Sequence, residues 1–387
     1  MTAQPVPAQP QTSPPPVAAG ETRVWDLGVR GFHWLTVASF LVASATALTD
    51  PTRFFLVHVL SGTFVLVFVA FRAIWGFTGS SYARFSSFWF TPAQIVDRLR
   101  ETLAGRERRY VGHNPLGATM IYALLAALVA TVATGYVAMG GFLKAGPFKA
   151  LVTFDTAALA RGAHSLFAYG AMFLVGFHLA GVALEVLRHR EPLVRAMVTG
   201  RKTSAPNARP ARPAKARPAL AAVLFAVLLG GASWATAALS ALPAYGVPPP
   251  ATDKIYVDEC GACHFAMPPS IASTKTWDAI LSGLGHHFGE DASVDPSHVA
   301  HLKAYLDANS ADHFDTLAAH ALSRTDPSDP LRPTSSRFWR FRHDGLPKSV
   351  FDAKAVGGRT SCNACHKDAV DGIFSPFAID IPEGAFQ

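Results

Sequence analysis

Every cysteine of the chain lies in one of two short motifs that end in histidine. They are C-G-A-C-H with Cys260, Cys263 and His264, and C-N-A-C-H with Cys362, Cys365 and His366. Two cysteines separated by two residues and followed by histidine form the attachment signature of c-type haem, whose iron the histidine binds. A disulfide framework would not need these histidines, and a thioredoxin-like site would occur once, inside a βαβ pattern. Zinc binding is the competing interpretation, and we expect two covalently bound c haems.

Each iron would take a sixth ligand from elsewhere in the chain. Met267 follows His264 too closely to reach the opposite face of the same porphyrin, and no methionine occurs after it. The candidates are His287, or its neighbour His286, for the first c haem, and His343 for the second. Ligation by two histidines is expected to give a lower potential than ligation by histidine and methionine. The remaining histidines of this region fall on polar stretches and are interpreted as surface residues: His298, His301, His313 and His320.

Four more histidines lie in long apolar stretches, where histidine is uncommon and usually functional. They are His33, His58, His164 and His178. Any one of them could simply make an interhelical hydrogen bond. His164 and His178 are 14 residues apart, a separation of about 21 Å along a helix and within about 40° of one face. One helix would therefore present two ligands on one side, at two depths.

Five apolar stretches must carry these histidines, each near the ~20 residues needed to cross a bilayer. They cover about residues 32–49, 54–75, 116–140, 164–187 and 219–242. Lys and Arg number 6 in residues 76–115 and 9 in 188–218, but 1 in 50–53 and 3 in 141–163. The positive-inside rule predicts a cytoplasmic N-terminus and a periplasmic C-terminal region, in a bacterial inner membrane.

This topology pairs the membrane histidines by depth. His58 and His164 would lie near the outer surface, and His33 and His178 near the cytoplasmic surface. Imidazoles bound to iron satisfy their polar atoms, which removes most of the cost of burying them. We expect two b haems, one held by each pair.

The other segments complete the predicted organisation, an all-α fold. Residues 1–22 form a disordered cytoplasmic tail without the pattern of a signal peptide. Residues 23–200 form a four-helix membrane domain, and the basic, Pro- and Ala-rich linker 201–218 either stops the chain before a helix or touches anionic lipid. A fifth transmembrane helix covers 219–242. Residues 243–387 form a periplasmic domain of short helices and loops, without a long alternating strand pattern.

The charge distribution supports a membrane protein. Only 16% of the residues are charged, against about 25% in soluble domains. Residues 243–387 carry 12 Lys and Arg and 18 Asp and Glu, a net charge of −6, so the first 242 residues carry +13. Because these basic residues lie in short loops between apolar runs, they indicate topology and not nucleic-acid binding.

The chain resembles two known families. Residues of about 23–200 resemble the bacterial cytochrome b561 family, itself similar to the cytochrome b subunits of nickel–iron hydrogenases and formate dehydrogenases. The matching strings are R-G-F-H-W-L-T (30–36), V-H-V-L-S-G (57–62) and G-H-N-P-L-G (112–117), with the spacing of His164 and His178. Residues of about 254–387 resemble the bacterial dihaem cytochrome c family, in E-C-G-A-C-H-F-A-M-P-P (259–269), H-H-F-G-E-D-A-S (286–293) and S-C-N-A-C-H (361–366).

The first resemblance implies a dihaem b module that exchanges electrons with the quinone pool, using ubiquinone or menaquinone. The second implies bis-histidine c haems and a small oxygen-binding haem protein as a relative's partner. Similarity to the formate dehydrogenase subunit implies a quinone site near the cytoplasmic haem, close to His178 and to Gly112, His113 and Asn114. His113 would either relay a proton from quinol or cap the helix that begins near Pro115.

The predicted function is transmembrane electron transfer by a quinol:acceptor oxidoreductase, from the quinone pool to a soluble periplasmic redox protein, either a cytochrome or an oxygen-binding haem protein. Inward flow to quinone, including oxidation of superoxide, is an alternative. A tethered carrier without quinone chemistry, and a redox or gas sensor, are others. The sequence leaves a homodimer open.

Overall fold

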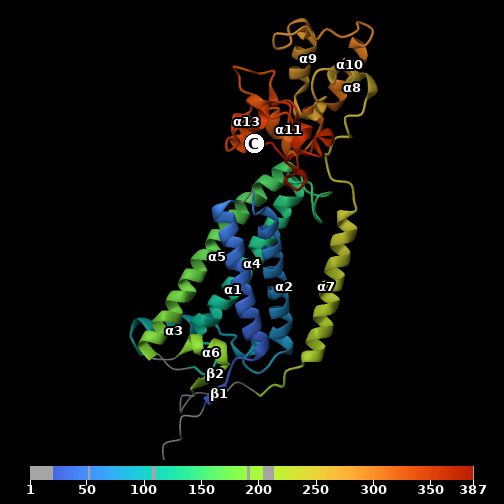
Figure 1. Ribbon diagram of the computed structural model, residues 1–387. Coiled ribbons are helices and arrows are strands. Elements are labelled where there is room, and N and C mark those ends of the chain that lie inside the picture. The colour runs from blue at the N-terminus through green and yellow to red at the C-terminus, as the bar shows by residue number, and fades with distance from the viewer. Residues whose placement is uncertain (1–20, 51–52, 107–109, 190–191, 204–212, 387) are drawn as a thin grey trace, which may run out of the picture. The chain divides into compact units, whose positions relative to one another are not determined.

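The computed structural model describes the chain except for residues 1–20, 51–52, 107–109, 190–191, 204–212 and 387. Most of the predicted tail and the centre of the predicted linker lie outside the described residues. The fold is all-α as expected, with five long helices and a C-terminal head of short helices (Figure 1).

Five helices are long and apolar enough to cross a membrane, which confirms the five predicted spans. They are α1 (Leu27–Thr49), α2 (Phe55–Thr78), α4 (Pro115–Phe142), α5 (Phe154–His189) and α7 (Pro218–Ser240). The largest difference from expectation is α5, which begins well before residue 164. Its first turn is capped by Thr153, whose Oγ1 accepts a hydrogen bond from the N–H of Thr156 at 3.2 Å, and this cap precedes a run of good helix formers. The chain is an integral membrane protein.

The chain divides into two compact units. The first comprises Met1–Thr49, Leu56–Leu128 and Gly170–Val227, and the second Asp50–Phe55, Val129–Tyr169 and Leu228–Gln387. The second unit therefore joins one end of the membrane helices to the whole head.

In the first unit, Asp26 organises the start of α1. Its carboxylate accepts hydrogen bonds from the N–H of Val29 at 2.8 Å, from Trp75 Nε1 at 3.0 Å and from Ser80 Oγ at 2.6 Å. The first bond caps α1, and the other two tie it to the end of α2. Gly28 is required here, because a Cβ at this position would lie 2.6 Å from the Trp75 ring.

Two short strands were not predicted. β1 (Glu21–Arg23) pairs antiparallel with β2 (Arg201–Thr203). The carbonyl of Gly200 accepts from the N–H groups of Val24 and Trp25, at 2.9 and 3.1 Å. Gly200 has a φ of 81° and ends the short helix before β2, a conformation that glycine adopts without strain. β1 thus begins within the predicted tail 1–22, and β2 within the predicted linker 201–218.

Two further helices belong to the first unit, α3 (Pro92–Leu103) and α6 (Leu193–Thr199), with the 3₁₀ turn η1 (Phe85–Ser87). A capping box starts α3: Thr91 Oγ1 accepts from the N–H of Gln94, and Gln94 Oε1 accepts from the N–H of Thr91 at 2.8 Å. This amphipathic helix lies within the loop expected between the second and third spans.

The head consists of short helices and 3₁₀ turns around small apolar clusters. Its helices are α8 (Lys254–Cys260), α9 (Thr274–Ser282), α10 (Val299–Asn309), α11 (Leu317–Leu322), α12 (Arg337–His343), α13 (Lys348–Asp352) and α14 (Cys362–Cys365). Its 3₁₀ turns are η2 (Pro269–Ile271), η3 (Leu284–His286), η4 (Ala311–His313), η5 (Pro333–Ser335), η6 (Ala369–Asp371) and η7 (Pro376–Ala378). One cluster gathers Tyr256, Trp277, Leu302 and Leu306. In a domain with so little regular structure, these apolar clusters must supply much of the stability.

Within the second unit, a buried ion pair ties the loop after α4 to the head. Lys144 Nζ lies 3.0 Å from Asp315 Oδ2, with the lysine side chain 1% and the aspartate 20% exposed. The same oxygen accepts from the N–H of Phe154 at 2.8 Å. Asp315 Oδ1 lies 3.1 Å from His320 Nε2, and the His320 ring stacks on Phe154 at 4.1 Å. One carboxylate thus joins three segments.

Candidate haem sites

The first c-type motif lies at the end of α8. Asp253 caps this helix by accepting from the N–H of Tyr256 at 2.9 Å, and Tyr256 Oη donates to the carbonyl of Met267. His264 follows the helix, and its Nδ1–H donates to the carbonyl of Phe265 at 2.8 Å. The imidazole of His287 lies opposite, with ring centroids 6.4 Å apart and planes inclined by 28°. The structure thus brings His287 to His264.

A strained turn places His287. Phe288 has a φ of 52° and Gly289 of 101°, and the N–H of Glu290 donates to the carbonyl of His287 at 3.2 Å. A positive φ is costly for an aromatic residue and tends to occur at functional sites. His286 lies on the 3₁₀ turn before it and interacts electrostatically with Asp291. The side chain of Met267 packs in a cluster with Ile271, Phe338 and Trp339.

The second c-type motif faces His343. Ser336 caps α12 by accepting from the N–H of Trp339 at 3.2 Å, and the helix ends at His343. The His343 Nδ1–H donates to the carbonyl of Trp339 at 2.9 Å, while the Trp339 indole stacks on its ring at 4.4 Å. The ring centroids of His343 and His366 lie 6.1 Å apart, with planes inclined by 67°. His343 is therefore held rigidly beside the second motif.

Both separations fit an iron atom between two imidazoles. Metal–imidazole bonds of about 2.0 Å on each side would hold the ring centroids about 6 Å apart. The Nδ1–H bonds of His264 and His343 leave Nε2 as the nitrogen with a lone pair for the metal. Burial, and then the charge of His343, lower the pKa of His366 to about 4, so this ring is neutral at pH 7, as a metal ligand must be.

A structural zinc ion is almost always held by four ligands. Among the described residues, no group of three or more His, Cys, Asp or Glu side chains is arranged to hold a metal ion. The zinc interpretation is disfavoured.

Two of the membrane histidines show the same hydrogen-bond pattern. His58 Nδ1 donates to the carbonyl of Ala43 on α1 at 3.0 Å, and His164 Nδ1 donates to the carbonyl of Thr131 on α4 at 2.8 Å. In each case the bond makes Nε2 the ring nitrogen that carries the lone pair. Gly135 is necessary for the second contact, because a Cβ there would lie 3.0 Å from His164 Nδ1.

His33 and His178 come together in the first unit. Their imidazoles interact electrostatically, although α1 and α5 are far apart in sequence. Nδ1 of His33 is buried and has no hydrogen-bond partner within the described part of the chain. A buried imidazole nitrogen without a hydrogen-bond partner is unfavourable unless a further group occupies the site.

His113 lies in an aromatic cluster of the first unit. Its ring centroid is 4.5 Å from that of Trp25 and 4.6 Å from that of Phe88. Burial, followed by the charges of Arg72 and Lys202, lowers the pKa of His113 to about 3. His113 does not cap α4: Asn114 does so, as its Oδ1 accepts from the N–H of Gly117 at 2.7 Å. The capping interpretation of His113 is wrong.

Arg72 also belongs to this cluster, although it was not predicted as a site residue. Arg72 lies within α2 and is only 3% exposed, with its guanidinium 4.7 Å from the Phe85 ring centroid. Its Nη1 is buried without a hydrogen-bond partner among the described residues. An arginine inside the apolar string FVAFRAIW was the available signal, since charges within a membrane span usually have a function.

The other histidines of the head were predicted to be surface residues, but they make more contacts than that prediction implies. His298 Nδ1 lies 2.6 Å from Glu259 Oε1, and His301 Nε2 lies 2.9 Å from Asp253 Oδ2. His320 belongs to the Asp315 network, and His313 ends the turn η4. The surface interpretation is thus wrong for His320, which joins two segments.

Comparisons with known proteins match the two parts of the chain to cytochrome families. Residues 24–200 match the family described as prokaryotic cytochrome b561, and residues 256–374 match the family described as dihaem cytochrome c. A probable Ni/Fe-hydrogenase B-type cytochrome subunit from Cupriavidus necator is 25% identical over 221 residues, which cover 48% of this chain and 91% of that protein.

Solved structures similar to the chain are dihaem cytochromes c. One from Shewanella baltica OS155 is 30% identical, with 34% of this chain and 93% of that chain covered and a TM-score of 0.27. One from Rhodobacter sphaeroides is 33% identical, with 32% and 96% covered and a TM-score of 0.27. The head of the chain belongs to the dihaem cytochrome c family and its membrane part matches the prokaryotic cytochrome b561 family, and the chain is a transmembrane electron-transfer protein that binds b and c haems.

Proposed function

We propose that the chain is a quinol:acceptor oxidoreductase of a bacterial inner membrane, which transfers electrons from the quinone pool to a soluble periplasmic acceptor. Its N-terminus lies in the cytoplasm and its head in the periplasm. The basic loops 76–115 and 188–218 support this orientation, because positive loops remain in the cytoplasm.

Four histidine pairs hold the haems in this proposal. His33 with His178 bind the inner b haem, and His58 with His164 the outer one. His264 with His287 bind the first c haem, and His343 with His366 the second, while Cys260, Cys263, Cys362 and Cys365 attach the two porphyrins. When bound, the haems supply one-electron iron couples. The chain itself orients four of these imidazoles through Nδ1–H bonds to backbone carbonyls, those of His58, His164, His264 and His343.

The aromatic cluster around His113 is the quinol site of the proposal. Trp25 and Phe88 are buried and pack their apolar rings against His113, and a quinone ring is flat and apolar. A histidine with a pKa of about 3 is neutral, so His113 exchanges a hydrogen bond with quinol and does not store its proton. Gly112 and Asn114 flank it, and ubiquinol and menaquinol both fit this chemistry.

The facing imidazoles in the head are the main support for the proposal, because they provide two ligand sets for c haems within the predicted periplasmic domain. The head has a net charge of −6 over residues 243–387. An acidic head favours a basic docking partner, such as a soluble cytochrome or a small oxygen-binding haem protein.

Stopped-flow mixing of the purified chain with a quinol tests the proposal, recorded separately at the b and c absorption bands. Reduction of the b haems is expected first, followed by the c haems. Replacing His33 and His178 together by alanine should abolish both phases, whereas replacing the surface residue His301 should not. Reduction of the c haems without the b haems, or no reduction at all, would refute the proposal.

A further inference from the structure

Arg72 is a buried cation that makes no ion pair in the described part of the chain. Only 3% of its surface is exposed, and its Nη1 has no hydrogen-bond partner there. Asp26 interacts with it electrostatically, but the carboxylate of Asp26 is already held by the N–H of Val29, Trp75 Nε1 and Ser80 Oγ. A buried charge with an unsatisfied donor is unfavourable unless a bound group supplies an acceptor. The structure therefore favours a ligand oxygen at Arg72.

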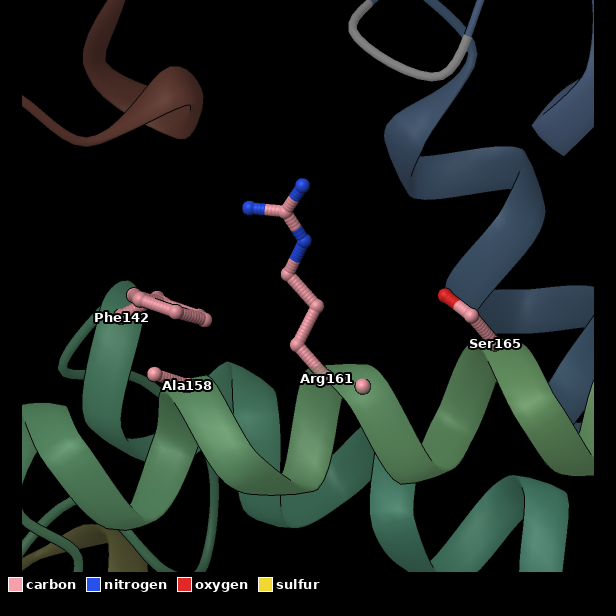
Figure 2. Close-up of a pocket in the computed structure, with 5 residues that line it drawn as sticks. Phe142, Ala158, Arg161 and Ser165 are labelled. Carbon is pink, nitrogen blue, oxygen red and sulfur yellow. The ribbon is translucent and has the colours of Figure 1, made fainter.

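Burial distinguishes Arg72 from Arg161 of α5. Arg161 lines a hollow of about 340 Å³ together with Phe142, Ala158, Gly162 and Ser165. Figure 2 shows its side chain extending from α5 into open space, and the residue is exposed. An exposed arginine near the end of a span can extend its charged group to water, which satisfies its donors. Arg161 therefore requires no ligand, whereas the enclosed guanidinium of Arg72 does.

Aromatic rings surround the Arg72 guanidinium and connect it to His113. Its Cζ lies 4.7 Å from the ring centroid of Phe85 and 5.8 Å from that of Phe88. Phe88 also contacts His113, with ring centroids 4.6 Å apart. Tyr122 of α4 packs on both phenylalanines, with its centroid 5.8 and 5.6 Å from theirs. A permanently charged donor and a neutral imidazole thus belong to one aromatic cluster of the first unit.

The position of Arg72 along α2 agrees with the depth of the inner b site in the proposed function. Arg72 follows His58 by 14 residues, the spacing that also separates His164 from His178. Fourteen residues advance about 21 Å along a helix and return to within about 40° of the same face. Arg72 therefore lies on the face of α2 that carries His58, at the depth where His178 would bind the inner haem.

We propose that Arg72 binds an oxygen of the quinone headgroup in the His113 site and stabilises the anion that quinol forms when it loses its first proton. This inference rests on the proposed function and adds to it the group that binds the charge of the substrate. Arginine is always protonated and presents several N–H donors. It therefore binds an anionic oxygen more strongly than a neutral one.

Protons and electrons balance in this scheme. Quinol loses two protons and two electrons when it becomes quinone. The first proton passes to solvent, because His113, with a pKa of about 3, does not retain it at neutral pH. The electrons pass one at a time to ferric b-haem iron, which becomes ferrous, and the second proton follows the first. Arg72 lowers the free energy of the anion through charge-assisted hydrogen bonds.

Calorimetric titration of the oxidised full chain with two flat quinones tests this role without any electron transfer. Naphthoquinone is neutral, whereas hydroxynaphthoquinone has an acidic hydroxyl that is ionised at neutral pH. The unmodified chain should bind the anionic probe more tightly, and equal affinity for the two probes would overturn the proposal. Arg72→Gln should weaken binding of the anionic probe about a hundredfold, as expected when a donor to an anionic oxygen is removed. Binding of the neutral probe should change much less.

Arg98→Gln is the matched control. Arg98 is also 3% exposed and lies 5.6 Å from the ring centroid of Tyr110, but it has carboxylate partners at 3.9 Å in Glu101 and Glu185. This variant should keep the preference for the anionic probe, and loss of the preference would assign the effect to packing and overturn the proposal. Arg72→Lys keeps the charge and serves where the glutamine variant does not fold. It should retain the preference, and its loss would refute selection of the anion by charge.

Further results separate this inference from the proposed function. If quinol reduces no haem in the unmodified chain but the anionic probe binds through Arg72, the proposed function fails and the binding role of Arg72 stands. If quinol reduces the haems as before in Arg72→Gln and the probe preference is unchanged, only the role of Arg72 fails. Unchanged probe binding with a lowered b-haem potential in a redox titration of Arg72→Gln would assign Arg72 to a haem propionate and overturn the proposal.

Discussion

Replacing Asp315 by asparagine should release the loop after α4 from the head. Asp315 accepts hydrogen bonds from Lys144 Nζ at 3.0 Å and from the N–H of Phe154 at 2.8 Å, and it faces His320. Asparagine keeps the shape of the side chain but removes its charge. The substitution therefore leaves the buried Lys144 without a counterion.

The expected magnitude follows from burial. The Lys144 side chain is 1% exposed, and leaving one charge of a buried pair uncompensated costs about 3 to 5 kcal/mol. Because Asp315 is 20% exposed, water screens part of this interaction, and we expect the lower figure, about 3 kcal/mol. A change of that size shifts the equilibrium between docked and released loop about a hundredfold.

Hydrogen exchange measured by mass spectrometry can detect this change, because the amide of Phe154 is itself a partner of Asp315. Its exchange should accelerate about a hundredfold in Asp315→Asn, in line with the same free energy. Asp312→Asn is the control, since Asp312 is an exposed carboxylate that accepts from the N–H of Thr274 at 2.9 Å. Equal exchange in the two variants would refute the claim that the ion pair holds the loop.

The pH dependence of this contact has a definite sign. Burial raises the pKa of Asp315, but the hydrogen bonds of Lys144, Phe154 and His320 outweigh it, so the pKa lies below the ordinary 3.8. A carboxyl with a lowered pKa stabilises the docked state above its ordinary pKa and loses that contribution as pH falls through the lowered value. Protection of the Phe154 amide should accordingly persist at neutral pH and decline only below about pH 3.8.

Three further predictions concern the sites. His287→Ala should make one c haem of the reduced protein bind carbon monoxide, seen by absorption spectroscopy, whereas His286→Ala should not; binding in both would refute the choice of ligand. The folded chain lowers the pKa of His113 from the ordinary 6.5 to about 3, so the free energy of unfolding should fall as the pH drops below about 6.5. His113→Gln should make the melting temperature less dependent on pH in this range, as measured by thermal melts. A Cβ at Gly141 would collide with Ala157, so Gly141→Val should destabilise the contact of α4 with α5 by about 1–3 kcal/mol. Thermal melting measures this effect, and an unchanged melting temperature would contradict the packing.

The long helices and the haem motifs were predictable because each signal is local. Runs of apolar residues fix the spans whatever surrounds them, and a C-x-x-C-H string needs no tertiary information. The choice between His286 and His287 did need it: the backbone of Phe288 adopts a φ of 52°, which turns His287 toward His264. A positive φ is expected at glycine, so the sequence gives no reason to expect one at the aromatic residue Phe288.

Contacts between distant residues were not predictable. β1 and β2 pair with each other although they are about 180 positions apart in the sequence, and strands of three residues each are too short to carry a periodic pattern. Lys144 and Asp315 are separated by 171 positions, and each looks like an ordinary surface charge in sequence. They form an ion pair because the fold brings them together and buries them, and the sequence alone does not show which residues the fold buries.

One feature of the imidazoles links sequence, fold and chemistry. His58, His164, His264 and His343 all donate Nδ1–H to a backbone carbonyl, at 2.8 to 3.0 Å. The acceptors come from a neighbouring membrane helix, the next residue in a loop, or the preceding turn of the same helix, so no common sequence pattern marks them. Each bond fixes the tautomer and the rotation of its ring. In the proposed function these imidazoles bind iron, and a ligand held in this way would not have to reorganise when the metal changes oxidation state, which is the property that a chain of one-electron sites requires.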